Sequence, residues 1–326
     1  MKNTIQQRAQ GYDLIGDIHG HAGELTDLLY LLGYERGNGT YSHPKGRKVI
    51  FLGDYIDRGP RIREVLETVR GMMEGGSAFA ILGNHEVNAM RFHATGSDGN
   101  PLRPHTKNNV KQHRATLEQF PDRKELAEWL HWFSSLPLFL ECDGLRAVHA
   151  CWDDEAIAEL NCAGRLVGET LERFSRKGSA EYEIMSRTVN GPEALLPVGY
   201  QHETADSRMR SEFRVKWWVD LQGLTCREAI FPDDPVIPHL PLRDVPLACN
   251  YPTKAPVTFF GHYALKGSTP KLLRPNLACL DYGMGKGGFL CAYRWDGESS
   301  LDERKFIRSS ADFHKRDYNC PLELQR

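Results

Sequence analysis

The segment Val49-Ile50-Phe51-Leu52-Gly53-Asp54-Tyr55-Ile56-Asp57-Arg58-Gly59 sets four apolar residues directly before two carboxylates, a guanidinium and a glycine. The apolar residues predict a buried β-strand. A buried strand delivers the residues that follow it to the rim of its sheet, so the charged side chains are expected at that rim. A single segment of this kind also fits an ordinary solvated turn. A functional site is indicated only if similar segments occur elsewhere in the chain.

The same arrangement occurs on both sides of this segment. A strand predicted over residues 12–15 runs into Gly16-Asp17-Ile18-His19-Gly20, and one over 78–82 runs into Gly83-Asn84-His85-Glu86. Between these strands, apolar residues at helical spacing predict amphipathic helices over residues 24–33 and 62–73. Strands that alternate with helices indicate right-handed βαβ units and a largely parallel sheet.

The second half of the chain has weaker signals. Residues 91–109 favour an irregular loop, and residues 138–142 and 145–149 flank Asp143-Gly144, which is typical of a β-hairpin. Helices are predicted over residues 110–119, 124–133 and 155–176. Further strands are predicted over residues 256–260, 277–281, 289–295 and 301–307. We expect one α/β domain over residues 1–326, with insertions at about 91–135 and 153–256.

The composition is that of an ordinary globular protein. The 326 residues include 41 Lys+Arg and 43 Asp+Glu, a net charge of −2, and no basic excess indicates a nucleic acid or membrane partner. The polar N-terminus predicts no export signal, and no stretch has the about 20 apolar residues of a spanning helix. The 8 cysteines contain no C-x-x-C pair. A reduced, cytoplasmic protein is therefore expected.

Five predicted strands end in side chains that can bind metal ions or phosphate. The groups are Asp17 with His19, Asp54 with Asp57 and Arg58, Asn84 with His85, His149, and His262. Because the carboxyl ends of strands in an α/β sheet converge on one crevice, these groups can meet. Oxygen and imidazole donors without thiolates suit two divalent first-row ions better than calcium or a structural zinc. Such a pair of ions serves phosphate-ester hydrolysis.

The three blocks Gly16–Gly20, Gly53–Gly59 and Gly83–Glu86 resemble, in order and separation, those of the calcineurin-like metallophosphoesterases. The likeness is to the branch that contains the phosphoprotein phosphatases, and it also covers dinucleoside polyphosphate hydrolases. It implies a four-layer αββα sandwich with two central sheets. It also implies a phosphoric ester hydrolase that uses two divalent ions, manganese first, with iron, zinc, cobalt or nickel as alternatives.

The resemblance also implies roles for single residues. Asp17, His19 and His262 would hold one ion, Asn84 and His149 the other, and Asp54 would bridge them. A hydroxide shared by the ions would attack the phosphate directly. His85 would protonate the leaving group, Asp57 would orient His85, and Arg58, together with Asn84, would bind the phosphate. The family has a second phosphate-binding arginine, for which Arg187, Arg208, Arg210 and Arg214 are the candidates here.

The expected substrate is a phosphoprotein or a small phosphate ester or nucleotide. Glu86 and the Asp57-Arg58 pair favour monoester cleavage of the protein Ser/Thr phosphatase type. Hydrolysis of diadenosine tetraphosphate is the alternative, and a non-catalytic metal-binding scaffold is the alternative of another class.

Two further features are given no catalytic role. Gly283-Met284-Gly285-Lys286-Gly287-Gly288 matches G-x-G-x-x-G, but a strand follows it, so a hairpin turn is expected in place of a dinucleotide site. His93, His105 and His113 lack fixed spacing and are expected on a solvated or substrate-facing loop.

Overall fold

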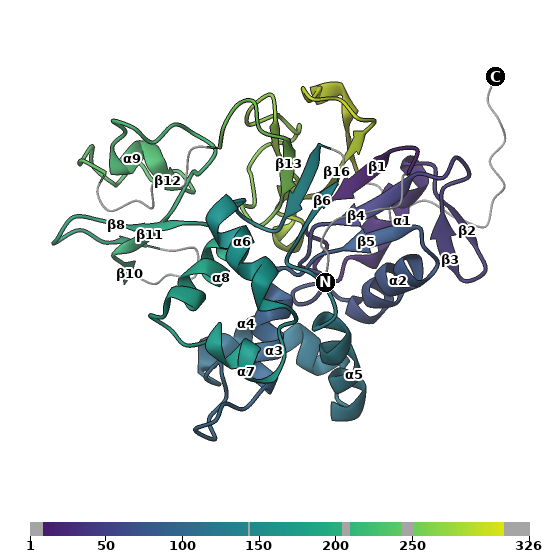
Figure 1. Cartoon of the computed structure of the whole chain (residues 1–326), viewed down its shortest axis with the longest axis horizontal. Helices are drawn as coiled ribbons and strands as arrows, with labels where there is room; N and C mark the ends of the chain where they lie inside the picture. The colour runs from purple at the N-terminus through teal and green to yellow at the C-terminus, as the bar shows by residue number, and fades with distance from the viewer. Residues whose placement is uncertain (1–8, 143, 204–208, 243–250, 310–326) are drawn as a thin grey trace.

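The computed structural model describes residues 9–142, 144–203, 209–242 and 251–309 and contains two large β-sheets (Figure 1). The strands of the first sheet are, in spatial order, β15 (Asp281–Tyr282), β16 (Phe289–Trp295), β1 (Tyr12–Ile15), β4 (Lys48–Phe51) and β5 (Ala78–Ala80), with β17 (Phe306–Arg308) also on β16. Those of the second are β14 (Leu277–Cys279), β13 (Val257–Phe260), β7 (Leu145–Val148) and β6 (Phe139–Cys142).

The two sheets stack face to face because alternate residues of their strands are apolar and buried. Side chains from both sheets form one buried cluster, which includes Leu14, Ile50, Leu52, Leu140, Ala147 and Phe259. Successive side chains of a strand point to opposite faces, so Val49 and Phe51 face the other way and pack in a second cluster with the helices. Each sheet therefore has one face on its partner and one face under helices.

Helices complete the outer layers. Helices α1 (Ala22–Leu31) and α2 (Ile62–Glu74) contribute Leu25, Leu28, Val65 and Val69 to the cluster that covers the first sheet. Helices α6 (Asp154–Ala163) and α8 (Ala180–Asn190) contribute residues such as Ile157 and Val189 to the cover of the second. The predicted α/β sandwich is confirmed.

The strand directions bring the loops of interest to one edge. Strands β1, β4 and β5 are parallel, as are β7, β13 and β14. The segments after β1, β4, β5, β7 and β13 begin where these strands end, and they carry the side chains singled out above. The predicted hairpin is present, with β6 antiparallel to β7.

Three helices follow β5. Helix α3 (Asn84–His93) was not predicted: residues 91–109 were expected to form a loop, but the helix runs to His93. Its apolar residues Val87, Ala89 and Met90 join the core, but polar residues between them hide the helical pattern in the sequence. Helices α4 (Lys107–Gln119) and α5 (Arg123–Phe133) agree with the sequence.

The segment between β7 and β13 contains more structure than expected. The single helix predicted over residues 155–176 is wrong: α6 ends before Gly164, which has a φ of 75°, and α7 (Gly168–Arg173) follows. After α8, a three-stranded sheet of β8 (Glu193–Leu195), β11 (Glu212–Val215) and β12 (Ile230–Phe231) packs with α9 (Cys226–Ala229) around its own small core. Figure 1 shows this green lobe to one side of the stacked sheets.

The remaining elements are short. They are β2 (Glu35–Gly37), β3 (Thr40–Ser42), β9 (His202–Glu203), β10 (Met209–Arg210), and the 3₁₀ turns η1 (Met284–Lys286) and η2 (Glu303–Lys305). Among the helices of the described residues, none combines the length and the apolar character that crossing a bilayer requires.

Candidate metal centre

Strand β4 delivers Asp54 to the middle of the site. Its carboxylate is buried, with 1% of the residue exposed, and lies 3.5 Å from Nε2 of His19 and 3.4 Å from Nε2 of His149. The main-chain N–H of His85 donates to Asp54 Oδ1 at 3.0 Å. Side chains that follow β1, β5 and β7 thus converge on one carboxylate from β4.

The backbone at these positions is strained. Five site residues adopt a left-handed conformation, with φ of 46° at His19, 55° at Asp54, 65° at Asp57 and at Arg58, and 69° at His262. Each such residue costs about 1 kcal/mol or more, and such conformations are typical of functional sites. The surrounding structure holds these side chains where they converge.

Glu86 supports the turn that carries Asp54. Its buried carboxylate accepts the N–H groups of Gly83, Asp54 and Tyr55 at 2.8–2.9 Å. Burial and the neighbouring Asp54 raise the pKa of Glu86 to about 7. Glu86 therefore acts on the loop and does not face the reacting groups directly.

Two imidazoles are oriented as metal ligands usually are. Nδ1–H of His19 donates to the carbonyl of Ile56 at 2.9 Å, and Nδ1–H of His149 donates to that of Leu52 at 2.7 Å. Each bond turns the opposite Nε2 toward Asp54. A hydrogen bond from one ring nitrogen to a carbonyl is the usual support for a histidine whose other nitrogen binds a metal.

Asn84 and His262 complete this side of the site. Oδ1 of Asn84 lies 3.1 Å from Nε2 of His149 and 2.9 Å from Nδ1 of His262. Nε2 of His262 is buried and has no hydrogen-bond partner among the described residues. Buried polar atoms are nearly always satisfied, so this lone nitrogen fits a metal ligand.

Asp17 follows β1 and is also buried. Its carboxylate accepts the main-chain N–H of His262 at 3.1 Å, and a Cβ at Gly261 would stand 2.0 Å from Asp17 Oδ1, so glycine is required there. Burial, then the negative charges of Asp281 and Asp54, raise the pKa of Asp17 well above its ordinary value. A nearby cation would relieve this repulsion.

The imidazoles have divergent pKa shifts. Burial disfavours a charged His149, yet the Asp54 carboxylate raises the pKa of His149 to about 10. Burial and Arg58 lower the pKa of His19, and burial and Arg214 lower that of His262. A lowered pKa favours the neutral imidazole that coordinates a metal, and a divalent ion could take the place of a charged His149 beside Asp54.

The residues fall into two sets that share Asp54, each with its potential ligand atoms within 4.8 Å of one another. The sets are His19, Asp54 and His85, and Asp54, His149 and His262. This grouping differs from the expectation in that the imidazole of His262 lies with His149 and Asn84, whereas only its main-chain N–H reaches Asp17.

His85 and Asp57 form a close pair beside this centre. Nδ1 of His85 donates to Asp57 Oδ2 at 2.5 Å, and Nη2 of Arg58 lies 3.2 Å from Nε2 of His85. Asp57 is 3% exposed, whereas Arg58 lies on the surface. The arrangement suits an imidazole that transfers a proton next to a guanidinium that binds phosphate.

Two residues of helix α4 also reach Asp57, and neither was expected to have a role in the site. Nδ1 of His113 donates to Asp57 Oδ1 at 2.9 Å, and the hydroxyl of Thr116 donates to the same oxygen. Both residues are 1% exposed, so the expectation of a solvated His113 is wrong. The only signal in the sequence is their i, i+3 spacing on one helical face.

The four candidate arginines differ in their surroundings. Arg187 forms an ion pair with the buried Asp153, and Arg208 lies outside the described residues. Arg210 lies on the short strand β10. Arg214, on β11, sets its guanidinium 5.3 Å from the ring of Tyr263, next to His262, and its buried Nε has no hydrogen-bond partner among the described residues.

The glycine-rich loop also borders the centre. A Cβ at Gly285 would stand 2.5 Å from Cδ of Arg58 and 2.9 Å from Cδ2 of His19, so the loop lies directly against both side chains. Burial and the charge of Arg58 lower the pKa of the adjacent Lys286. The expected hairpin turn is present as β15–η1–β16, and it adds a cation to the rim of the site.

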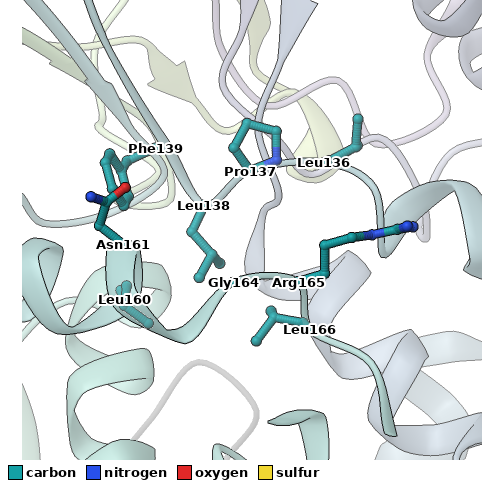
Figure 2. A pocket seen from close by; sticks show the side chains of 9 residues that line it. All are labelled: Leu136, Pro137, Leu138, Phe139, Leu160, Asn161, Gly164, Arg165 and Leu166. Atoms are coloured by element: carbon teal, nitrogen blue, oxygen red, sulfur yellow. The ribbon is translucent and has the colours of Figure 1, made fainter. Parts of the chain in front are cut away.

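A separate pocket, shown in Figure 2, lies between the start of β6 and the end of α6. Leu138, Leu160 and Leu166 are among its lining residues, and its volume of about 20 Å³ holds roughly one water molecule. It is too small for a substrate and contains none of the residues described above.

Two sets of carboxylate and imidazole side chains that could each hold a metal ion share Asp54 and lie next to the Asp57–His85 pair and Arg58. This is the arrangement of a candidate dinuclear metal centre. The chain belongs to the calcineurin-like phosphoesterase family, whose model matches residues 13–262. This family uses a dinuclear divalent metal centre. The predicted family and hydrolase class are thereby confirmed.

Curated relatives match the chain over part of their length. The bis(5'-nucleosyl)-tetraphosphatase PrpE [asymmetrical] of Halalkalibacterium halodurans is 46% identical over 74 residues, which is 23% of this chain and 30% of that protein. The protein of the same name from Geobacillus sp. is 32% identical over 169 residues, 48% of this chain and 67% of that protein. The chain thus spans between about a third and two thirds of these relatives.

Among solved structures, the cold-active protein-tyrosine phosphatase of a psychrophilic Shewanella species is similar in fold. The alignment has a TM-score of 0.50 and 16% sequence identity, and it covers 95% of this chain and 83% of that chain. At this identity the likeness concerns the fold alone.

Proposed function

We propose that this protein hydrolyses phosphate monoesters whose leaving group is an alkoxide, as in a phosphorylated serine. The observation that supports this most is the pair of the buried Asp57 and the partly buried His85, 2.5 Å apart, beside the candidate metal ligands. An alkoxide is a poor leaving group unless it is protonated, and an imidazole held by a carboxylate is suited to deliver that proton.

In this proposal the ions are held by Asp17, His19, Asp54, Asn84, His149 and His262, with Asp54 between the two ligand sets. Two divalent ions there would activate water as the nucleophile and stabilise charge on the phosphoryl oxygens, with manganese the first candidate. The lone Nε2 of His262 and the orientation of His19 and His149 support this ligand set.

The side chains of the protein carry out the remaining tasks. Arg58 binds phosphate oxygens with its planar guanidinium, assisted by Asn84, and Arg214 is the second arginine. As the oxygen of water bonds to phosphorus and the ester P–O bond breaks, His85 donates its Nε2 proton to the departing oxygen. The products are inorganic phosphate and the alcohol, and Asp57 stabilises the imidazolium before the transfer.

Hydrolysis of dinucleoside polyphosphates is the second candidate. It is favoured by the names of the curated relatives and by the three cations around the centre, Arg58, Arg214 and Lys286, which come from separate segments. Its leaving group is a nucleotide phosphate with a pKa of about 6, which needs little protonation. The Asp57–His85 pair has less to contribute to that reaction.

Paired assays with the manganese-loaded protein test the choice. We expect a higher kcat/KM for a phosphoserine peptide than for diadenosine tetraphosphate, and His85→Ala to lower monoester turnover about 10²- to 10⁴-fold at normal metal content. A preference for diadenosine tetraphosphate, with ATP and AMP as products, supports the second candidate. If neither substrate is hydrolysed, the non-catalytic metal-binding scaffold is the remaining alternative.

A further inference from the structure

Helix α4 places two buried polar side chains against Asp57, the residue that holds His85. Nδ1–H of His113 and the hydroxyl of Thr116 both donate to Asp57 Oδ1, and the main-chain N–H of Asp57 donates to Thr116 Oγ1 at 3.1 Å. The helix lies far from Asp57 in sequence, so the contact exists only in the folded protein.

Because of these contacts, the two oxygens of the Asp57 carboxylate bind different parts of the protein. Oδ1 takes the two donors from α4, and Oδ2 is left for Nδ1–H of His85 at 2.5 Å. A carboxylate bound on both oxygens has a fixed plane, and that plane fixes the direction of the His85 ring. Since Asp57 also has a left-handed backbone with a φ of 65°, α4 stabilises both its main chain and its side chain.

The orientation of His113 is itself set by its neighbours. Because its Nδ1 carries the proton given to Asp57, its Nε2 accepts a hydrogen bond from Nε2–H of His93, at 3.2 Å. The ring of Phe92 lies against His113, with centroids 5.3 Å apart. Both ring nitrogens of His113 are therefore engaged, and the imidazole has one orientation.

We propose that His113 is a positioning residue for leaving-group protonation: its Nδ1–H fixes the Asp57 carboxylate so that His85 presents Nε2 to the departing oxygen. This inference rests on the proposed function, because it assigns His113 a part in the same proton transfer. His113 acts through Asp57 and does not touch the substrate.

Substrates with different leaving groups distinguish this role of His113 from a purely structural one. His113→Leu removes the donor, and we expect a kcat about 10- to 100-fold lower with phenyl phosphate, whose leaving group needs a proton. With 2,4-dinitrophenyl phosphate, whose leaving group does not, the loss is expected to stay below about threefold. An equal loss with both substrates would overturn the proposal.

Conservative and control variants sharpen the result. His113→Asn keeps a nitrogen donor near the position of Nδ1 and is expected to restore most of the phenyl phosphate activity. Thr116→Val removes the other donor and should show the same dependence on leaving group, to a smaller extent. His105→Leu is the control: it removes an imidazole that stacks on Phe92 but forms no hydrogen bond with Asp57. This variant should leave the dependence of kcat on the leaving group unchanged.

A double-mutant cycle separates this proposal from the proposed function. In a His85→Asn background, adding His113→Leu should change kcat with phenyl phosphate less than about twofold, because residues that act as one unit are not additive. A full additional loss would overturn the role of His113. Failure of the wild-type protein to hydrolyse either aryl phosphate would instead contradict the proposed function. Metal content and thermal unfolding of each variant exclude a folding defect.

Discussion

Asp13 and Asp17 are buried carboxylates on one stretch of chain, the first inside β1 and the second just beyond its end, and they have opposite surroundings. Asp13 accepts hydrogen bonds from Arg47, Arg294 and Tyr34 at 3.0–3.1 Å. Asp17 accepts the main-chain N–H of His262 and lies near the negative charges of Asp54 and Asp281.

The difference shows which buried charges stabilise the fold and which serve the site. Arginines of the protein itself neutralise Asp13, so the ion-pair network around Asp13 is complete without a bound ion. Asp17, at the other end of the strand, has carboxylates as its charged neighbours in place of arginines, and a divalent cation would relieve their mutual repulsion. The comparison predicts opposite responses of the two ends to metal ions and to loss of charge.

The largest expected effect concerns metal binding. At free Mn²⁺ about 1,000 times the dissociation constant, each site should add about 4 kcal/mol to the free energy of unfolding. Asp54→Asn, which removes the shared ligand, should abolish most of this gain. Urea denaturation with Mn²⁺ or EDTA measures both, with metal analysis expected to approach two ions per wild-type chain. An equal gain in the variant would show that the ions bind elsewhere.

An intermediate effect is expected at Asp13, inside β1. Asp13→Asn leaves Arg47 and Arg294 without their buried counter-ion and should lower the free energy of unfolding by about 3 kcal/mol, with or without metal. Asp296→Asn is the matched control, because Asp296 also pairs with Arg47 but its side chain is 46% exposed. Its loss should cost under about 1 kcal/mol. Equal costs for the two variants would contradict a structural role confined to Asp13.

The smallest effect is expected at Asp17, where loss of the charge should raise the free energy of unfolding of the metal-free protein, in contrast to Asp13. Because the pKa of Asp17 is raised in the folded protein, ionising it costs folded-state stability. That stability falls as pH rises from the unfolded pKa of about 3.9 through the folded value. Asp17→Asn should therefore stabilise the EDTA-treated protein at pH 8 and flatten the pH dependence of its stability.

Urea denaturation between pH 5 and 8 is the measurement for Asp17→Asn. With Mn²⁺ present, the same variant should be less stable than wild type, because a ligand is missing. Destabilisation in EDTA as well would mean that Asp17, like Asp13, serves the fold, and the comparison would fail.

The convergence of the candidate ligands was largely predictable because each of them follows a strand with a clear pattern. Buried apolar runs located β1, β4 and β13, and polar residues directly after them located Asp17, Asp54 and His262. Local rules reach this far because the carboxyl ends of parallel strands must meet. They do not extend to α3, whose apolar residues are separated by polar ones.

The supporting residues were not predictable in the same way. His113 and Thr116 lie on a polar helix and Lys286 in a glycine-rich turn, where local patterns indicate only solvent or flexibility. Arg214 could not be separated from three other arginines, because the difference is a buried Nε beside Tyr263. Such features depend on which elements pack together over long distances in sequence.

The sequence by itself determined the family, the candidate ligands at the strand ends and the class of chemistry, because these depend on short segments whose residues follow a fixed local order. Only the tertiary structure decided that the ring of His262 lies with that of His149, that Arg214 lies against Tyr263, and that α4 holds Asp57. Those outcomes depend on strained turns and on contacts between distant elements, and neither leaves a periodic trace in the chain.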